Sequence, residues 1–173
     1  MQQTDNRSNT FSCRFCGKPL TRTFIDLGMS PIANDYVPFE KHCAMEPFYP
    51  LHVFICDSCL LVQLPNIKRE DEIFTDEYAY FSSYSTSWLA HAKEYVESMI
   101  SRFPITDQSL VIELASNDGY LLQYFKEKNI PVLGVEPTAN TARVAMQKGI
   151  ETIVKFFGVD TAEEMKAQGK TAN

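Results

Sequence analysis

Apolar residues recur at three- and four-residue spacing between residues 86 and 103, which is the pattern of a helix that buries one face. The apolar positions are Trp88, Leu89, Ala92, Tyr95, Val96, Met99, Ile100 and Phe103. Ser85 or Thr86 supplies a side-chain oxygen that can cap the first turn, and Pro104 helps to end the helix. The sequence therefore predicts an amphipathic helix in this region.

Beyond this helix, short apolar runs alternate with helical patterns. We expect strands at 110–114, 132–136 and 152–156, and helices at 120–128 and 138–148. Asp160 and Glu163 offer a capping box for a last short helix, which Gly169 closes. Strands and helices that alternate in this way form parallel strands joined by right-handed crossovers. The expected strand order, 3-2-1, leaves one edge of the first strand open to self-association or to a partner chain.

The part of the chain before the helix follows a different pattern. Short strands are expected at 24–27 and 49–56, with turns at Gly28, Pro31 and Pro38. We divide the chain into a disordered start (1–10), a cysteine-containing lobe (11–68), a connector with the helix (69–104) and an α/β region (105–173). The predicted fold class is α/β, with a small lobe ahead of a parallel sheet.

Composition narrows the classes of function. Sixteen Lys and Arg against twenty-two Asp and Glu give a net charge of -6, whereas a nucleic-acid-binding surface needs a basic face. The polar start has no apolar run, and no stretch approaches the roughly 20 apolar residues of a membrane span. We therefore expect no nucleic-acid partner, no membrane association and a cytoplasmic protein.

Two Cys-x-x-Cys pairs, Cys13 with Cys16 and Cys56 with Cys59, are the strongest motif. In a reducing compartment such pairs are more often thiolate ligands of a metal than disulfides. Two knuckles complete a tetrahedral shell of four sulfurs with no open position, so the predicted Zn²⁺ is structural. The 39 residues between the pairs exceed the usual gap of a zinc ribbon, but the entropy of loop closure grows only with the logarithm of length.

Other interpretations of the cysteines stay open at this point. Iron binds in the same shell of four sulfurs, and four buried, unrelated cysteines are a further alternative. Cys43, with His42 beside it, and His52 are candidates for a substitute ligand, although a surface or core role suits them better.

The turn after the first parallel strand is the second candidate site. Glu113, Ala115, Asn117 and Gly119 occupy the positions where a nucleotide-binding fingerprint has its acidic and small residues, although only Gly119 is a glycine. Glu136 ends the second strand about 17 positions after Gly119, where a carboxylate can accept hydrogen bonds from both ribose hydroxyls. A solvated strand end is the alternative role for Glu136.

Taken together, these motifs resemble the sugar C-methyltransferases, the deoxysugar 3-C-methyltransferases that act on nucleotide-activated 4-keto sugars. The matching stretches cover most of the chain and are 13–59 with 27–35 between the cysteine pairs, 78–88, 113–122, 134–137, 148–150 and 156–158. The resemblance implies a zinc-binding domain, then a Rossmann-like (class I methyltransferase) domain that binds S-adenosylmethionine, of which this chain holds the first half.

The resemblance also implies roles for residues. Glu113, Ala115, Asn117 and Gly119 would shape the cofactor loop, and Glu136 would hold the adenosine ribose. The Tyr- and Ser-rich segment would lie beside the cofactor or the sugar, especially at Tyr78, Tyr80, Ser82 and Ser83. An aromatic connector that only packs is the alternative for that segment.

No catalytic residue is assigned within the chain. Members of the family run well beyond this length, and the general base is expected in a C-terminal part beyond Asn173. His91 lies among charged residues of the helix and is expected to be an exposed helix residue. Turnover by the 173-residue chain alone is therefore not expected. The alternative function is a non-catalytic, zinc-containing module that binds a protein partner.

Overall fold

The computed structural model describes residues 11–172, and the chain divides into two compact units, the first ending at Ile73 and the second beginning at Phe74. The predicted disordered start, residues 1–10, lies outside the described residues. No helix in the described part has the length and apolar character that crossing a membrane would require. The mixed α/β architecture with a parallel sheet confirms the predicted fold class.

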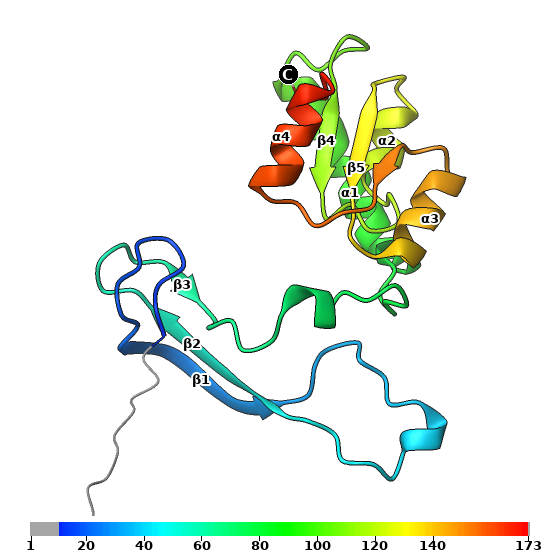
Figure 1. The fold of residues 1–173 in the computed structure, drawn as a ribbon. Coiled ribbons are helices and arrows are strands. Elements are labelled where there is room, and N and C mark those ends of the chain that lie inside the picture. Colours follow the sequence, from blue (N-terminus) through cyan, green and yellow to red (C-terminus); the bar gives the residue numbers. More distant parts are fainter. Residues whose placement is uncertain (1–10, 173) are drawn as a thin grey trace, which may run out of the picture. The chain divides into compact units, whose positions relative to one another are not determined.

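The first unit is a three-stranded antiparallel sheet in the order β1 (Arg22–Ser30), β2 (Tyr49–Ile55) and β3 (Val62–Gln63). Strands β1 and β2 form a long hairpin (Figure 1). Register shifts interrupt their pairing between Thr23 and Ile25 and between Asp26 and Met29. A short 3-10 helix, Phe39–Lys41, lies in the connection between the two strands, and a second, Glu70–Glu72, follows β3. Both expected strands are present, and β1 is longer than predicted.

The core of the first unit is very small. Its buried apolar residues are Cys13, Leu20 and Cys56, with the partly buried Phe11, Phe54 and Leu61 packed around them. Two of its three buried members are cysteines. So small a core supplies little burial free energy, and a lobe of this kind requires an additional constraint, such as a bound metal.

The first helical element of the second unit is a 3-10 turn, Ser82–Tyr84, which leads into α1 (Thr86–Arg102). Ser85 is the N-cap of α1, and its hydroxyl accepts a hydrogen bond from the backbone N–H of Trp88 at 3.2 Å. Only Ala92 and Val96 of α1 are buried, and Trp88 is 42% exposed. The predicted helix and its cap are confirmed, but Trp88 is not a core residue.

The sheet of the second unit is parallel, in the order β4 (Val111–Leu114), β5 (Val132–Val135) and β6 (Thr152–Ile153). The first of these strands therefore lies at an edge, as the expected order 3-2-1 requires. The helices are α2 (Leu122–Lys126), α3 (Ala139–Gln147) and α4 (Val159–Ala167).

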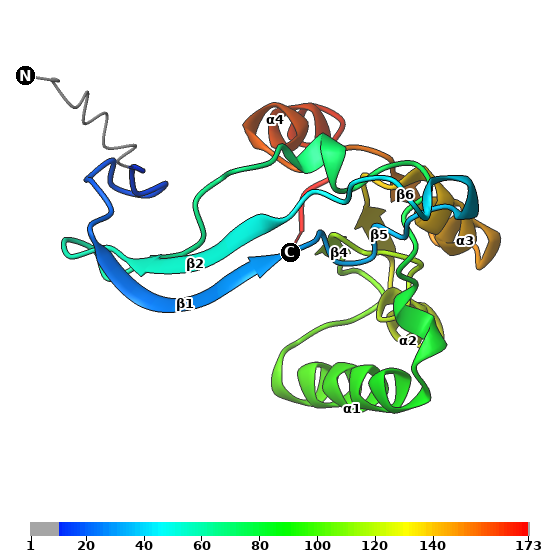
Figure 2. The ribbon, with the colours of Figure 1, turned by 90° about the horizontal axis from the view of Figure 1, so that it is seen from below.

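Apolar clusters cover both faces of this sheet. One cluster joins Val96 of α1, Leu122 and Phe125 of α2, and Ala145 of α3. The other joins Met165 of α4 to Leu133 and Val135 of β5, and Figure 2 shows α4 on the opposite side of the strands from α1 and α2. The sheet is thus a middle layer, and its strand ends are held in place from both sides.

The predicted capping box for α4 is wrong. The helix begins at Val159 after an extended Gly158, so Asp160 lies in the first turn rather than at the cap. No side chain caps this end, and the Thr161 hydroxyl instead donates to the carbonyl of Phe156 at 2.8 Å.

Candidate metal centre and cofactor loop

The two Cys-x-x-Cys turns have nearly the same backbone geometry. The N–H of Gly17 donates to the carbonyl of Cys13 and the N–H of Leu60 to the carbonyl of Cys56, each at 2.9 Å. Gly17 and Leu60 both have positive φ, 71° and 63°, so each turn closes with a left-handed residue. This closure points both thiols of a pair in one direction.

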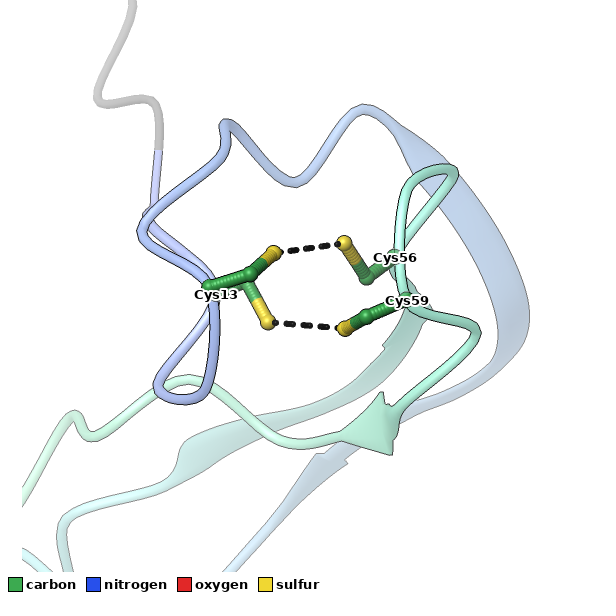
Figure 3. Close-up of side chains that lie close together, drawn as sticks. Cys13, Cys56 and Cys59 are labelled. Atoms are coloured by element: carbon green, nitrogen blue, oxygen red, sulfur yellow. Dashed lines mark hydrogen bonds between the residues drawn. The ribbon is translucent and has the colours of Figure 1, made fainter.

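The four cysteines form one cluster, in which the ligand atoms of Cys13, Cys16, Cys56 and Cys59 all lie within 4.8 Å of one another. The Sγ atoms of Cys13 and Cys59 are 3.6 Å apart and those of Cys16 and Cys56 are 3.5 Å apart (Figure 3). A disulfide requires about 2.05 Å, and all of these thiols are free. A Zn–S distance of about 2.3 Å in a tetrahedron places sulfurs about 3.8 Å apart, so the cluster fits Zn²⁺.

Nearby donors favour thiolates in this cluster. The backbone N–H of Cys16 lowers the pKa of Cys13 to about 6, and the amide of Gln63, which donates to Cys13 Sγ at 3.2 Å, contributes. The backbone N–H of Cys59 likewise lowers the pKa of Cys56. The pKa of Cys59 rises to about 12: the N–H of Leu61 lowers it, but burial and the neighbouring sulfurs outweigh that effect. Sulfurs this close together need a cation before all of them can be ionised.

The substitute ligands considered from the sequence lie elsewhere. Cys43 is exposed and outside the cluster. The ring of His52 stacks on Phe54 and forms a hydrogen bond to the Thr23 hydroxyl at 2.7 Å. The His42 ring contacts the carbonyl of Phe39. The metal centre among the described residues therefore consists of the four paired cysteines.

The turn after β4 has an unusual backbone in which Ala115, Asn117 and Gly119 have positive φ of 58°, 50° and 75°. Position 119 requires glycine for a second reason, because an added Cβ would lie 2.5 Å from the Ile150 side chain. This segment, residues 115–119, is called the cofactor loop below. It lies at the carboxyl end of β4, where open parallel sheets bind their ligands.

Glu136 holds the cofactor loop from the end of β5. Its carboxylate accepts from the backbone N–H of Asn117 and of Thr138, each at 2.9 Å, and from the Thr138 hydroxyl at 2.5 Å. Glu136 is only 4% exposed, so it is not a solvated strand end. A carboxylate has about four acceptor sites, and three of those in Glu136 are used within the chain itself.

Glu113 lies within β4, with its Oε2 buried and without a hydrogen-bond partner among the described residues. Burial raises the pKa of Glu113 to about 8, against a hydrogen bond from Tyr120 that lowers it. Burial also raises the pKa of Tyr120 to about 12, and the Tyr120 ring stacks on Trp88 with centroids 5.9 Å apart. Glu113 therefore carries a proton near neutral pH.

The Tyr- and Ser-rich segment, residues 78–83, runs along the cofactor loop. The Asn117 side chain accepts from the N–H of Ser82 at 2.9 Å and donates to the carbonyl of Tyr80 at 3.0 Å. Asn140 of α3 donates to the carbonyl of Tyr78 at 2.8 Å. Ser82 is buried, whereas the Tyr80 side chain is 46% exposed. The structure thus brings this segment and the loop together.

Four residues of these two sites have contacts that sequence reasoning missed: Gln63, Asp118, Asn140 and Lys148. Asp118 is fully buried, and its carboxylate accepts from the Ser83 hydroxyl and backbone. Lys148 donates to the Asp118 carbonyl at 2.8 Å. Asp118 and Lys148 lie in the matching stretches 113–122 and 148–150, but nothing in the sequence paired them, and Gln63 and Asn140 had no local pattern to mark them.

Comparison with known proteins supplies two findings. A methyltransferase-associated family model, described as "Putative zinc binding domain", matches residues 13–74. The chain is also 33% identical, over 153 residues, to the C-methyltransferase NovU of Streptomyces niveus. That match covers 88% of this chain but 36% of the relative, so the chain spans about a third of the length of the protein it matches.

Proposed function

The chain belongs to the methyltransferase family whose members carry this zinc-binding domain, and from that membership we propose that it is part of an S-adenosylmethionine-dependent C-methyltransferase. The proposed substrate is a nucleotide-activated keto-deoxysugar. The relative is a C-methyltransferase, which supports the reaction type, while the cofactor and the sugar are inferences. The proposal includes a cytoplasmic location, because four cysteines that form no disulfide and can bind a metal suit a reducing compartment.

The cofactor loop is the observation that carries the proposal. Its three left-handed residues lie at the carboxyl end of an open parallel sheet, and Glu136 fixes it from the neighbouring strand. S-adenosylmethionine would supply an electrophilic methyl group. Its amino group and ribose hydroxyls are hydrogen-bond donors, and the loop offers an acceptor, because Oδ1 of Asp118 is buried and has no partner among the described residues. The residues present therefore fit this cofactor.

The metal centre has a different role in the proposal. Four sulfurs fill a tetrahedral shell and leave no position for water or substrate. The metal therefore folds the first unit and takes no part in methyl transfer.

Calorimetric titration of the chain with S-adenosylmethionine tests the cofactor site. We expect weak binding, and Gly119→Ala should abolish it, because the new Cβ meets Ile150 at a left-handed position. Gly169→Ala is the matched control, since its φ of 74° imposes the same backbone strain with no atom within 4 Å of the Cβ. No heat at millimolar ligand, or equal binding by both variants, would overturn the proposed site.

A second candidate function is a zinc-containing module that binds a protein partner. The β1–β2 hairpin favours it, because Phe24, Leu27 and Met29 are each about 60% exposed. Exposed apolar side chains gathered on one element mark interaction surfaces. This function predicts that Phe24→Ser with Leu27→Ser abolishes a stable complex and that cofactor titration gives no heat.

A further inference from the structure

One contact between the cofactor loop and residues 78–83 is made by Asp118, a buried carboxylate that is paired with the partly buried Lys148. Asp118 has no exposed surface, and its Oδ2 accepts from the backbone N–H of Ser83 at 3.4 Å and from the Ser83 hydroxyl. The same oxygen lies 3.5 Å from Nζ of Lys148. Asp118 is therefore the junction between the loop, the segment and the end of α3.

Among the described residues, the cation in contact with this carboxylate is Lys148. It follows α3 as the C-cap residue, and its Nζ also donates to the backbone carbonyl of Asp118 at 2.8 Å. Two bonds to one residue fix both the backbone and the side chain of Asp118. A buried carboxylate that loses its partner is left uncompensated, which is far more costly than losing an exposed ion pair.

We propose that Lys148 is a positioning residue, which holds Asp118 so that Ser82 and Ser83 stay bonded to the cofactor loop before any ligand arrives. Only the functional consequence rests on the proposed function, namely that residues 78–83 are already ordered beside the site of the methyl donor before it binds. The positioning role itself does not depend on the proposed function, because all of the contacts lie within the chain. Preordering of this kind removes part of the entropic cost of binding.

The geometry gives the proposal a local readout. The N–H of Ser82 donates to Asn117 and that of Ser83 donates to Asp118. Amide hydrogen exchange at these two positions reports directly whether the segment stays on the loop. The measurement needs no cofactor, so its outcome is independent of whether S-adenosylmethionine binds.

The test compares Lys148→Met with Lys148→Arg in the complete chain. We expect the methionine variant to raise exchange at Ser82 and Ser83 on the order of tenfold, the loss of about one net hydrogen bond. Exchange in β5 should not change, and arginine, which keeps the charge, should restore most of the protection. Lys155→Met is the matched control, because it removes an exposed ion pair with Glu164.

Ser83→Ala provides a second route if Lys148→Met does not fold. It removes the hydroxyl that donates to Asp118 and leaves Lys148 in place. We expect faster exchange at Ser82 in this variant as well. Unchanged exchange at Ser82 and Ser83 in folded Lys148→Met, or at Ser82 in Ser83→Ala, would overturn the proposal. If exchange is faster in Lys148→Met and this variant also binds S-adenosylmethionine more weakly, the positioning role extends to cofactor binding. Faster exchange in a chain that binds no S-adenosylmethionine would support the positioning role and refute the proposed function alone.

Discussion

At the scale of single residues, Glu113 links the sheet to pH. Its pKa is raised to about 8 by burial, whereas an unfolded chain ionises a glutamate near the model value of 4.5. Between these two pH values the unfolded state binds fewer protons than the folded state. The stability of the second unit should therefore fall as the pH rises through this window, with a slope of up to about 1.4 kcal/mol per pH unit.

Glu113→Gln removes this titration, so its stability curve should be flatter between pH 4.5 and pH 8. Denaturant unfolding followed by fluorescence measures it, because Trp88 is the single tryptophan and lies in the second unit. Glu97→Gln, an exposed change on α1, is the control. If the free energies of unfolding of the wild type and of Glu113→Gln changed with pH in the same way, Glu113 would not be protonated in the folded state over this range.

Residues whose function depends on neighbours in sequence were predictable. The four cysteines are found from spacing alone, because a Cys-x-x-Cys turn sets its own geometry. Asn140 and Lys148 were not, because their partners Tyr78 and Asp118 lie 62 and 30 positions away in the chain. Only the packing of α3 beside the loop brings these pairs together.

At the scale of elements, β4 has an unpaired edge. The N–H of Val111 donates to the carbonyl of Pro131, just before β5, at 2.9 Å, and that of Ala115 donates to Val135 of β5 at 2.8 Å. By alternation the amides of Ile112 and Leu114 face the other side. Within the described part of the chain no strand pairs with that side. Apolar grooves flank the strand on both faces, and Leu114, 47% exposed, lines both of them. We propose that this edge associates with another chain.

Leu114→Lys should therefore reduce self-association, since a charge on an edge strand opposes pairing with a second strand. Sedimentation velocity over a range of concentrations measures the change. Val159→Lys, at a residue that is 74% exposed and lines neither groove, should leave association as it is in the wild type. A wild-type chain that stays monomeric throughout would count against association through β4.

The elements differed from prediction where local preferences competed. Asp160 has the chemistry of an N-cap, but the extended backbone at Gly158 starts α4 two residues earlier than such a cap allows. Helix α2 begins at Leu122 rather than at residue 120, because the left-handed turn through Gly119 precedes it. The length of β1 followed from its pairing with β2, which the spacing of its own apolar residues does not encode.

At the scale of the whole molecule, the two units have separate sources of stability. The second has apolar clusters on both faces of its sheet, whereas the first has two cysteines among its three buried core residues. A bound structural zinc contributes on the order of 10 kcal/mol, more than such a core supplies. The metal should therefore control one unit and not the other.

Removal of the metal with a chelator should unfold the first unit and leave the Trp88 unfolding transition of the second unchanged. Elemental analysis should find one zinc per chain in the wild type and in Cys43→Ser, whose thiol lies outside the cluster. Cys13→Ser should lose the metal, because three sulfurs leave the shell open, and its first unit should be unfolded even without a chelator. Nuclear magnetic resonance distinguishes the outcomes: resonances of residues 11–73 should collapse to narrow dispersion while those of β4 and β5 persist. If the first unit kept its dispersion without metal, the small apolar core would be sufficient to fold it, and the four cysteines would need another explanation.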